Sequence, residues 1–156
     1  MRVLVDENSA VQQVMAPLKH LLRGHQVDHV EDIGWKGKLD VPLFRDARQR
    51  GYEALITIDR QQLQSPEECR AIKNSQMHHI RYEQRRPGLP GLALAIGAVI
   101  AAMPGVMAHL EQARGQQLIR IISLDHAYSR FEATDPATDP PAYWPGQGRG
   151  RAPRRR

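Results

Sequence analysis

The chain has almost no cysteine and no segment that resembles an export signal. Cys69 is the only cysteine among 156 residues, which excludes an internal disulfide and a cysteine-rich zinc site. Only a few apolar residues separate Arg2 from Asp6, far fewer than a secretory signal needs. No internal repeat is detectable. We therefore expect a cytoplasmic protein in a reducing compartment.

Long apolar runs are also scarce. Only one stretch is long enough to compare with a membrane-spanning helix. Residues 89–108 carry no charged side chain, but they include Pro90, Pro104 and several glycines. Their most apolar part, residues 92–103, is shorter than the roughly 20 residues that span a bilayer. The stretch predicts a buried core helix and no membrane association.

The remaining composition suits one globular domain followed by a tail. The chain is 41% hydrophobic and 25% charged, enough to build one core without cross-links. We predict a folded domain over residues 1–130 and a disordered tail over 131–156, because the tail is rich in proline, glycine and arginine. Its arginines supply much of the net charge of +5, which suits a polyanionic partner such as nucleic acid.

Apolar runs that alternate with helical patterns predict an α/β fold. Crossover connections between such runs imply a mostly parallel sheet of about five strands, with helices on both faces in three layers. Polar residues in the last run suggest that it lies at a sheet edge. The expected strands are Val3–Val5, Val27–Val30, Ala54–Ile58, Met77–Tyr82 and Leu118–Leu124.

The expected helices begin at recognisable capping residues. Asn8 or Ser9 can cap the first helix, and the sequence around Ser65 reads as a capping box with proline at the first helical position. Asp40 is predicted to cap the second helix, with Val41, Phe44 and Ala47 on its buried face. The long apolar helix is predicted over residues 91–113.

Carboxylates follow two of the predicted strands at the point where each ends. Asp6 follows the first and Asp59 the third, and ligands of open parallel sheets collect at this edge. If these strands are neighbours, about 4.8 Å apart, the two like charges need a compensating cation or a raised pKa. Asp40, after the second strand, is the natural third member, although helix capping alone can explain it.

Oxygen ligands without cysteine or paired histidine favour Mg²⁺ or Mn²⁺. Around such an ion, Asp6, Asp40 and Asp59 could support hydrolysis of a phosphodiester. The alternative for each is a cap or an ordinary loop residue.

Basic residues near the same edge are candidate phosphate contacts. Arg60 follows Asp59 directly, and Arg85 and Arg86 follow the fourth strand. Each could instead be a solvated surface residue. Trp35 could stack on a base, but packing against the domain is the simpler interpretation.

Three further polar groups are weaker candidates. Glu7 should point away from Asp6, Asn8 is better explained as a cap, and Asp125 follows a predicted edge strand. His78 and His79 are neighbours in a strand and should face opposite sides of the sheet, which argues against a shared metal.

Three segments in order resemble a known family. "VLVDEN", "GHQVDHVEDIGWKGKLD" and "ALITIDR" are similar to PIN-like proteins of the DUF5615 and VapC toxin type, and the resemblance covers residues 2 to about 60. It implies an α/β/α PIN-like fold and a Mg²⁺- or Mn²⁺-dependent ribonuclease, commonly the toxin of a toxin–antitoxin pair. By position, the implied metal ligands are Asp6, Asp40 and Asp59.

The resemblance also suggests partners, namely RNA, a cognate antitoxin protein and a second copy of the chain. One departure stands out. The family pattern continues Asp-Arg-Asp-Phe, whereas this chain has Gln61 and Gln62 after Asp59 and Arg60.

Three functions therefore compete. The first is a metal-dependent ribonuclease, and the second is a catalytically degenerate PIN-like module that binds nucleic acid or a partner. The third is a phosphate-accepting receiver domain, which the sequence disfavours. "IRYEQRR" lacks the hydroxyl residue expected after the fourth strand, and "IISLDH" lacks the lysine expected after the fifth.

Overall fold

A computed structural model describes residues 1–7, 11–59, 61–122 and 124. Residues up to Leu124 form one compact unit, and the predicted tail lies outside the described residues. The unit is built around a sheet of five parallel strands in the order β2-β1-β3-β4-β5. The strands are β1 Arg2–Val5, β2 Gln26–His29, β3 Ala54–Thr57, β4 His78–Arg81 and β5 Leu118–Arg120.

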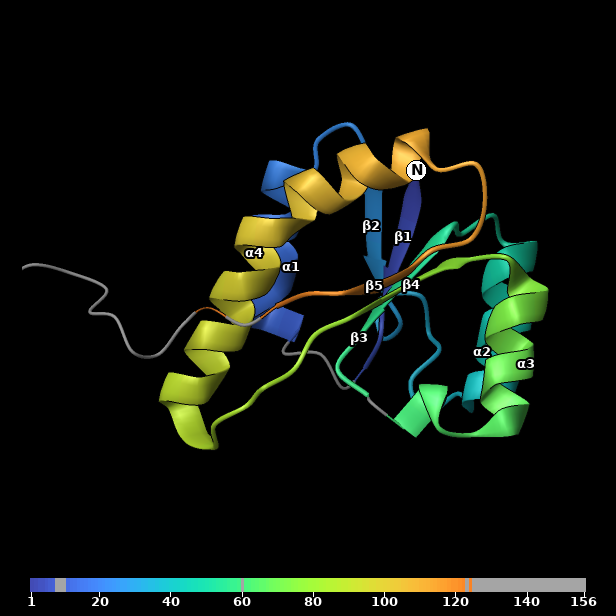
Figure 1. Ribbon diagram of the computed structural model, residues 1–156, viewed down its shortest axis with the longest axis horizontal. Helices are drawn as coiled ribbons and strands as arrows, with labels where there is room; N and C mark the ends of the chain where they lie inside the picture. Colours follow the sequence, from blue (N-terminus) through green and yellow to red (C-terminus); the bar gives the residue numbers. More distant parts are fainter. Residues whose placement is uncertain (8–10, 60, 123, 125–156) are drawn as a thin grey trace, which may run out of the picture. The chain divides into compact units, whose positions relative to one another are not determined.

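Helices cover both faces of the sheet, which confirms the predicted three-layer α/β architecture. In Figure 1, α1 and α4 lie on one side of the sheet and α2 and α3 on the other. A short 3₁₀ helix, η1, follows β3. The bounds are α1 Val11–Leu21, α2 Asp40–Gln49, η1 Gln61–Leu63, α3 Pro66–Ser75 and α4 Gly88–Gln112.

Each face of the sheet has its own apolar core, because successive strand residues point to opposite faces. Val3 and Val5 pack toward α1 and α4, whereas Leu4 packs toward α2 and α3. All three are fully buried, as the continuous apolar run predicted. The outer strand β5 pairs only with β4, so the expected sheet edge is also confirmed.

α4 is the helix predicted from the uncharged stretch, and it forms much of one core. Val99, Met103 and Met107 on its inner face are buried against the sheet and α1. By length and composition, it is the one helix of the described chain that could cross a membrane, and 33% of its most apolar window is buried. Core helices of soluble proteins pass the same test of length and composition.

Gly91 in α4 allows a nearby loop to approach the helix closely. A Cβ at this position would lie 1.8 Å from the Arg86 carbonyl oxygen, so only glycine permits the backbone of the β4–α4 loop to approach the helix. The loop that carries Arg85 and Arg86 can therefore lie against the first turn of α4.

The start of α2 differs from the prediction. Leu39 occupies the N-cap position with an extended backbone and no side-chain cap bond, and Asp40 is the first helical residue. Val41 is 38% exposed, so the buried face is formed by Leu43, Phe44 and Ala47 instead. The predicted caps Asn8 and Ser9 lie outside the described residues.

The start of α3 matches the prediction. The Ser65 hydroxyl oxygen accepts a hydrogen bond from the Glu68 backbone N–H at 3.4 Å, and Pro66 is the first helical residue. β4 and β5 are each shorter than the predicted strands Met77–Tyr82 and Leu118–Leu124.

Candidate acidic site

Asp6 and Asp59 lie at the carboxyl edge of neighbouring strands. β1 pairs with both β2 and β3, so strand order reverses at β1, and the crevice beside it is the usual ligand site of such sheets. The Asp6 N–H donates to the Ile56 carbonyl at 2.9 Å, which extends the ladder one residue past β1. The spatial relation expected from the sequence is therefore present.

Thr57 connects the two aspartates. Its hydroxyl donates to Asp6 Oδ2 at 2.8 Å, and its oxygen accepts from the Asp59 N–H at 3.0 Å. Thr57 is the last residue of β3 and fully buried. The hydroxyl fixes one oxygen of Asp6 and the backbone that carries Asp59.

Asp6 is held on its other sides as well. Its Oδ1 accepts from the Glu7 N–H at 2.8 Å, and its carbonyl oxygen accepts from His29 Nε2 at 3.1 Å. His29 Nδ1 accepts from the Glu31 N–H at 3.0 Å, so the ring proton must lie on Nε2. Asp6 is only 5% exposed, and burial raises the pKa of its carboxyl, with Glu7 and Asp59 adding to the rise against the two hydrogen bonds.

Asp40 belongs to the same electrostatic group. Burial raises its pKa to about 6, and the negative charges of Glu68, Asp6 and Asp59 contribute in that order. A hydrogen bond from Gln62 Nε2 to Asp40 Oδ1, at 2.6 Å, acts in the opposite direction. The carboxylates that follow β1 and β3 therefore both act on Asp40 at the start of α2.

We refer to Asp6, Asp40 and Asp59 as the acidic site. Asp40 also lines a cavity of about 420 Å³ with Pro42, Glu67 and Glu68, so the site opens toward the start of α3. The interactions that lower the pKa values of Asp6 and Asp40 are hydrogen bonds from Thr57, the Glu7 backbone and Gln62, none of which comes from a cationic side chain.

The donor set of the acidic site suits a hard divalent cation. All three side chains offer oxygen ligands, and the group carries repulsion that a cation would relieve. As the side chains stand, no three His, Cys, Asp or Glu residues of the described ranges are grouped tightly enough to hold a metal ion. Simultaneous coordination therefore requires side-chain rotation at half-buried Asp59, because side-chain hydrogen bonds from Thr57 and Gln62 hold Asp6 and Asp40.

The predicted phosphate contacts lie near the edge of the sheet or outside the described chain. Arg85 and Arg86 follow β4 and are exposed, with Arg85 Nε 3.8 Å from Glu83 Oε2. Arg60, like Asp125, lies outside the described residues.

Glu7 and Trp35 have structural contacts. Glu7 Oε2 accepts from the Gly37 N–H at 2.6 Å, which anchors the loop before α2. Trp35 packs on the core beneath α2, and its ring lies 4.3 Å from Lys38 Nζ and 4.4 Å from the Arg50 guanidinium. The packing interpretation of Trp35 is confirmed.

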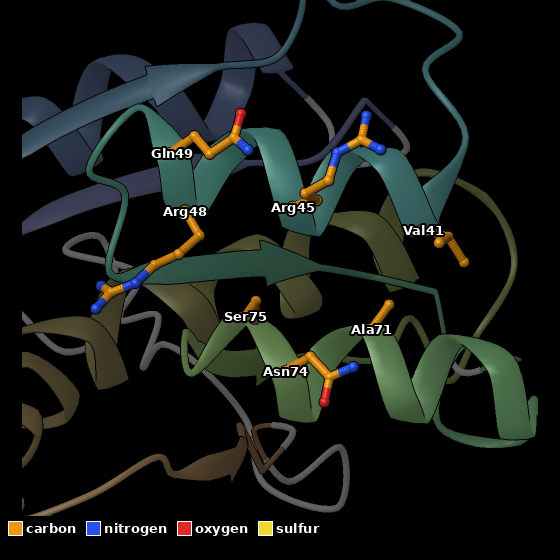
Figure 2. A pocket seen from close by; sticks show the side chains of 7 residues that line it. All are labelled: Val41, Arg45, Arg48, Gln49, Ala71, Asn74 and Ser75. Carbon is orange, nitrogen blue, oxygen red and sulfur yellow. The ribbon is translucent and has the colours of Figure 1, made fainter.

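A separate groove of about 390 Å³ runs between α2 and α3. Figure 2 shows Ala71 and Ser75 pointing from α3 toward α2, with Arg45 and Arg48 on the opposite helix. Arg45 is already paired with Asp46 at 2.7 Å. The groove shares only Val41 with the cavity beside Asp40 and contains no residue of the acidic site.

Three polar residues that support the site were not predicted from the sequence. Thr57, Gln62 and His79 are each at most 1% exposed. A threonine or histidine at a buried position of an apolar strand is a readable signal, since buried polar groups need partners. For Gln62, in a short polar segment, the sequence carries no such signal.

Fold and site together define an α/β protein with an acidic crevice at the strand-order reversal. Scans of protein-family models, curated proteins and solved structures each found no match to this chain.

Proposed function

We propose that the protein is a Mg²⁺- or Mn²⁺-dependent ribonuclease of PIN-like type. The observation that carries the proposal is that Asp6 and Asp59 follow neighbouring strands at the ligand edge of the sheet, joined through Thr57, and that their charges both raise the pKa of Asp40. The sequence resemblance assigns the same three residues. It also supports a toxin with an antitoxin partner, and a homodimer, as parts of the proposal, and the single cysteine supports a cytoplasmic location.

The chain's own residues would organise the reaction in a definite way. Asp6, Asp40 and Asp59 would hold the ion, which when bound lowers the pKa of water and stabilises charge on phosphate oxygens. Thr57 keeps one Asp6 oxygen oriented, and Gln62 does the same for Asp40. Arg85 and Arg86, which follow β4 and are exposed, would contact the RNA backbone.

The test is RNA cleavage by the full chain with Mn²⁺ and with a chelator. Asp6→Asn and Asp59→Asn should each lower cleavage by at least about 100-fold, as expected for loss of a charged group that organises the transition state. Asp32→Asn is the matched control, because Asp32 is 57% exposed and pairs only at the surface with Lys19. Cleavage that persists in both site variants, or in chelator, would contradict the proposal.

A second candidate is a degenerate PIN-like module that binds RNA or a partner without cleaving it. Two observations favour it: the acidic side chains are not grouped as a ready metal site, and Gln61 replaces the second acidic residue of the family pattern. RNA binding that is unaffected by chelator, without cleavage, would support this candidate over the first.

A further inference from the structure

Gln62 connects the acidic site to a buried histidine. Its Nε2 donates to Asp40 Oδ1 at 2.6 Å, and its Oε1 lies 3.1 Å from His79 Nε2. Gln62 is 1% exposed and His79 fully buried. These two contacts of Gln62 join η1 to α2 and to β4, three elements that are not adjacent in the sequence.

The direction of this chain of hydrogen bonds follows from the chemistry of its members. An ionised carboxylate only accepts, so the amide nitrogen of Gln62 must face Asp40 and its oxygen must face His79. His79 then donates from Nε2. Its Nδ1 is buried without a hydrogen-bond partner among the described residues, so a proton on Nδ1 would have no acceptor, and the ring is neutral.

The histidine end of the chain is held by packing. The His79 ring lies beside Phe44 of α2, with ring centroids 6.3 Å apart. Phe44 and Ala47 of α2 are themselves buried in the core on this face. A ring fixed in this way gives Gln62 a rigid point of attachment, and Gln62 transmits that rigidity to Asp40 at the helix start.

We propose that Gln62 and His79 are positioning residues that hold the Asp40 carboxylate for a divalent cation. The inference rests on the proposed function, since it needs the acidic site to bind the ion. It also gives a role to the departure from the family pattern at Gln62. Supporting hydrogen bonds of this kind typically contribute 10- to 100-fold to metal affinity.

The experiment measures the Mn²⁺ dissociation constant of the full chain by electron paramagnetic resonance. Gln62→Leu and His79→Phe should each weaken Mn²⁺ binding about 10- to 100-fold. Phenylalanine keeps an aromatic ring beside Phe44 but removes the donor. Gln61→Leu is the matched control, because only the backbone of Gln61 contacts the site, through its N–H to Asp59 Oδ1 at 2.7 Å.

The double variant separates positioning from general loss of stability. If the two residues act as one chain, Gln62→Leu with His79→Phe should weaken Mn²⁺ binding no more than Gln62→Leu alone. Circular dichroism establishes that each variant is folded, and His79→Phe tests the inference if Gln62→Leu is not.

The outcomes distinguish the two levels of the argument. Wild-type affinity in both folded single variants overturns the positioning role and leaves the ribonuclease proposal intact. Multiplied losses in the double variant also overturn the single-chain arrangement. A wild-type chain that binds no Mn²⁺ overturns the metal site and the positioning role together.

Discussion

Asp40→Asn should stabilise the protein above pH 6. The Asp40 pKa is raised from 3.8 to about 6, first by burial and then by the charges of Glu68, Asp6 and Asp59. The folded state therefore disfavours the ionised carboxylate. Asparagine removes that charge, keeps nearly the same shape and retains an oxygen that can accept the Gln62 hydrogen bond.

The sign and size of the effect follow from proton linkage. Between pH 4 and 6 the folded state holds more protons at Asp40 than the unfolded state, so the free energy of unfolding falls as pH rises through this window. A rise of roughly two pKa units corresponds to about 3 kcal/mol. Asp40 is only half-buried, and solvent screening should reduce the measured effect to about 1 to 2 kcal/mol.

Urea unfolding of the full chain at pH 4, 5, 6, 7 and 8, in chelator, measures this difference. Asp40→Asn and the wild type should agree within error at pH 4, and the variant should be more stable above pH 6. Asp32→Asn should show no such pH dependence, because Asp32 is exposed. A constant difference between Asp40→Asn and the wild type at every pH would refute the reasoning.

Four further substitutions, with Gly105→Ala as a control for one of them, test other parts of the structure. Thr57→Val removes a hydroxyl that donates to Asp6, and urea unfolding should show a loss of about 1.5 to 3 kcal/mol at pH 7; an unchanged midpoint would contradict the contact. Burial, followed by the charge of Arg81, lowers the His79 pKa to about 4, so the wild type should lose up to about 3 kcal/mol as pH falls from 6.5 to 4. His79→Phe should lack that component of acid sensitivity in the same titration. Ser65→Ala should lower thermal stability by about 0.5 to 1 kcal/mol, the lower part of the range for a lost cap, because its bond is 3.4 Å long. Gly91→Ala should cost about 1 to 3 kcal/mol in urea unfolding, since its Cβ would meet the Arg86 carbonyl, whereas Gly105→Ala meets no atom within 4 Å and should not destabilise.

The layers and the sheet could be predicted because their signals are local. Val3–Val5 is a continuous apolar run that both faces of a parallel sheet require, and Ser65 with Pro66 marks a helix start by hydrogen-bonding chemistry alone. The predicted meeting of Asp6 and Asp59 depended on the assumption that their strands are neighbours. The structure confirms that β1 pairs with β3.

Details that depend on tertiary packing could not be predicted in this way. Asp40 and Leu39 are one residue apart, and the sequence favoured the better capping residue although the chain caps with extended Leu39. Val41 fits the helical period, but α2 presents Leu43 to the core instead. Gln62 acquires its role only because η1 brings it between α2 and β4.

The electrostatics of the acidic site bears on the choice between an ion-binding crevice and a structural one. At neutral pH Asp40 is ionised, and its folded-state pKa of about 6 means that this charge lowers the stability of the fold. Its structural contact, the bond from Gln62, could also be accepted by the amide oxygen of asparagine, without that penalty. A carboxylate at this position is therefore better explained by something that binds to the charge than by support of the fold. A divalent cation would do this most effectively, because it would offset Asp6, Asp40 and Asp59 together, and the stability gained on adding Mn²⁺ should then shrink in Asp40→Asn.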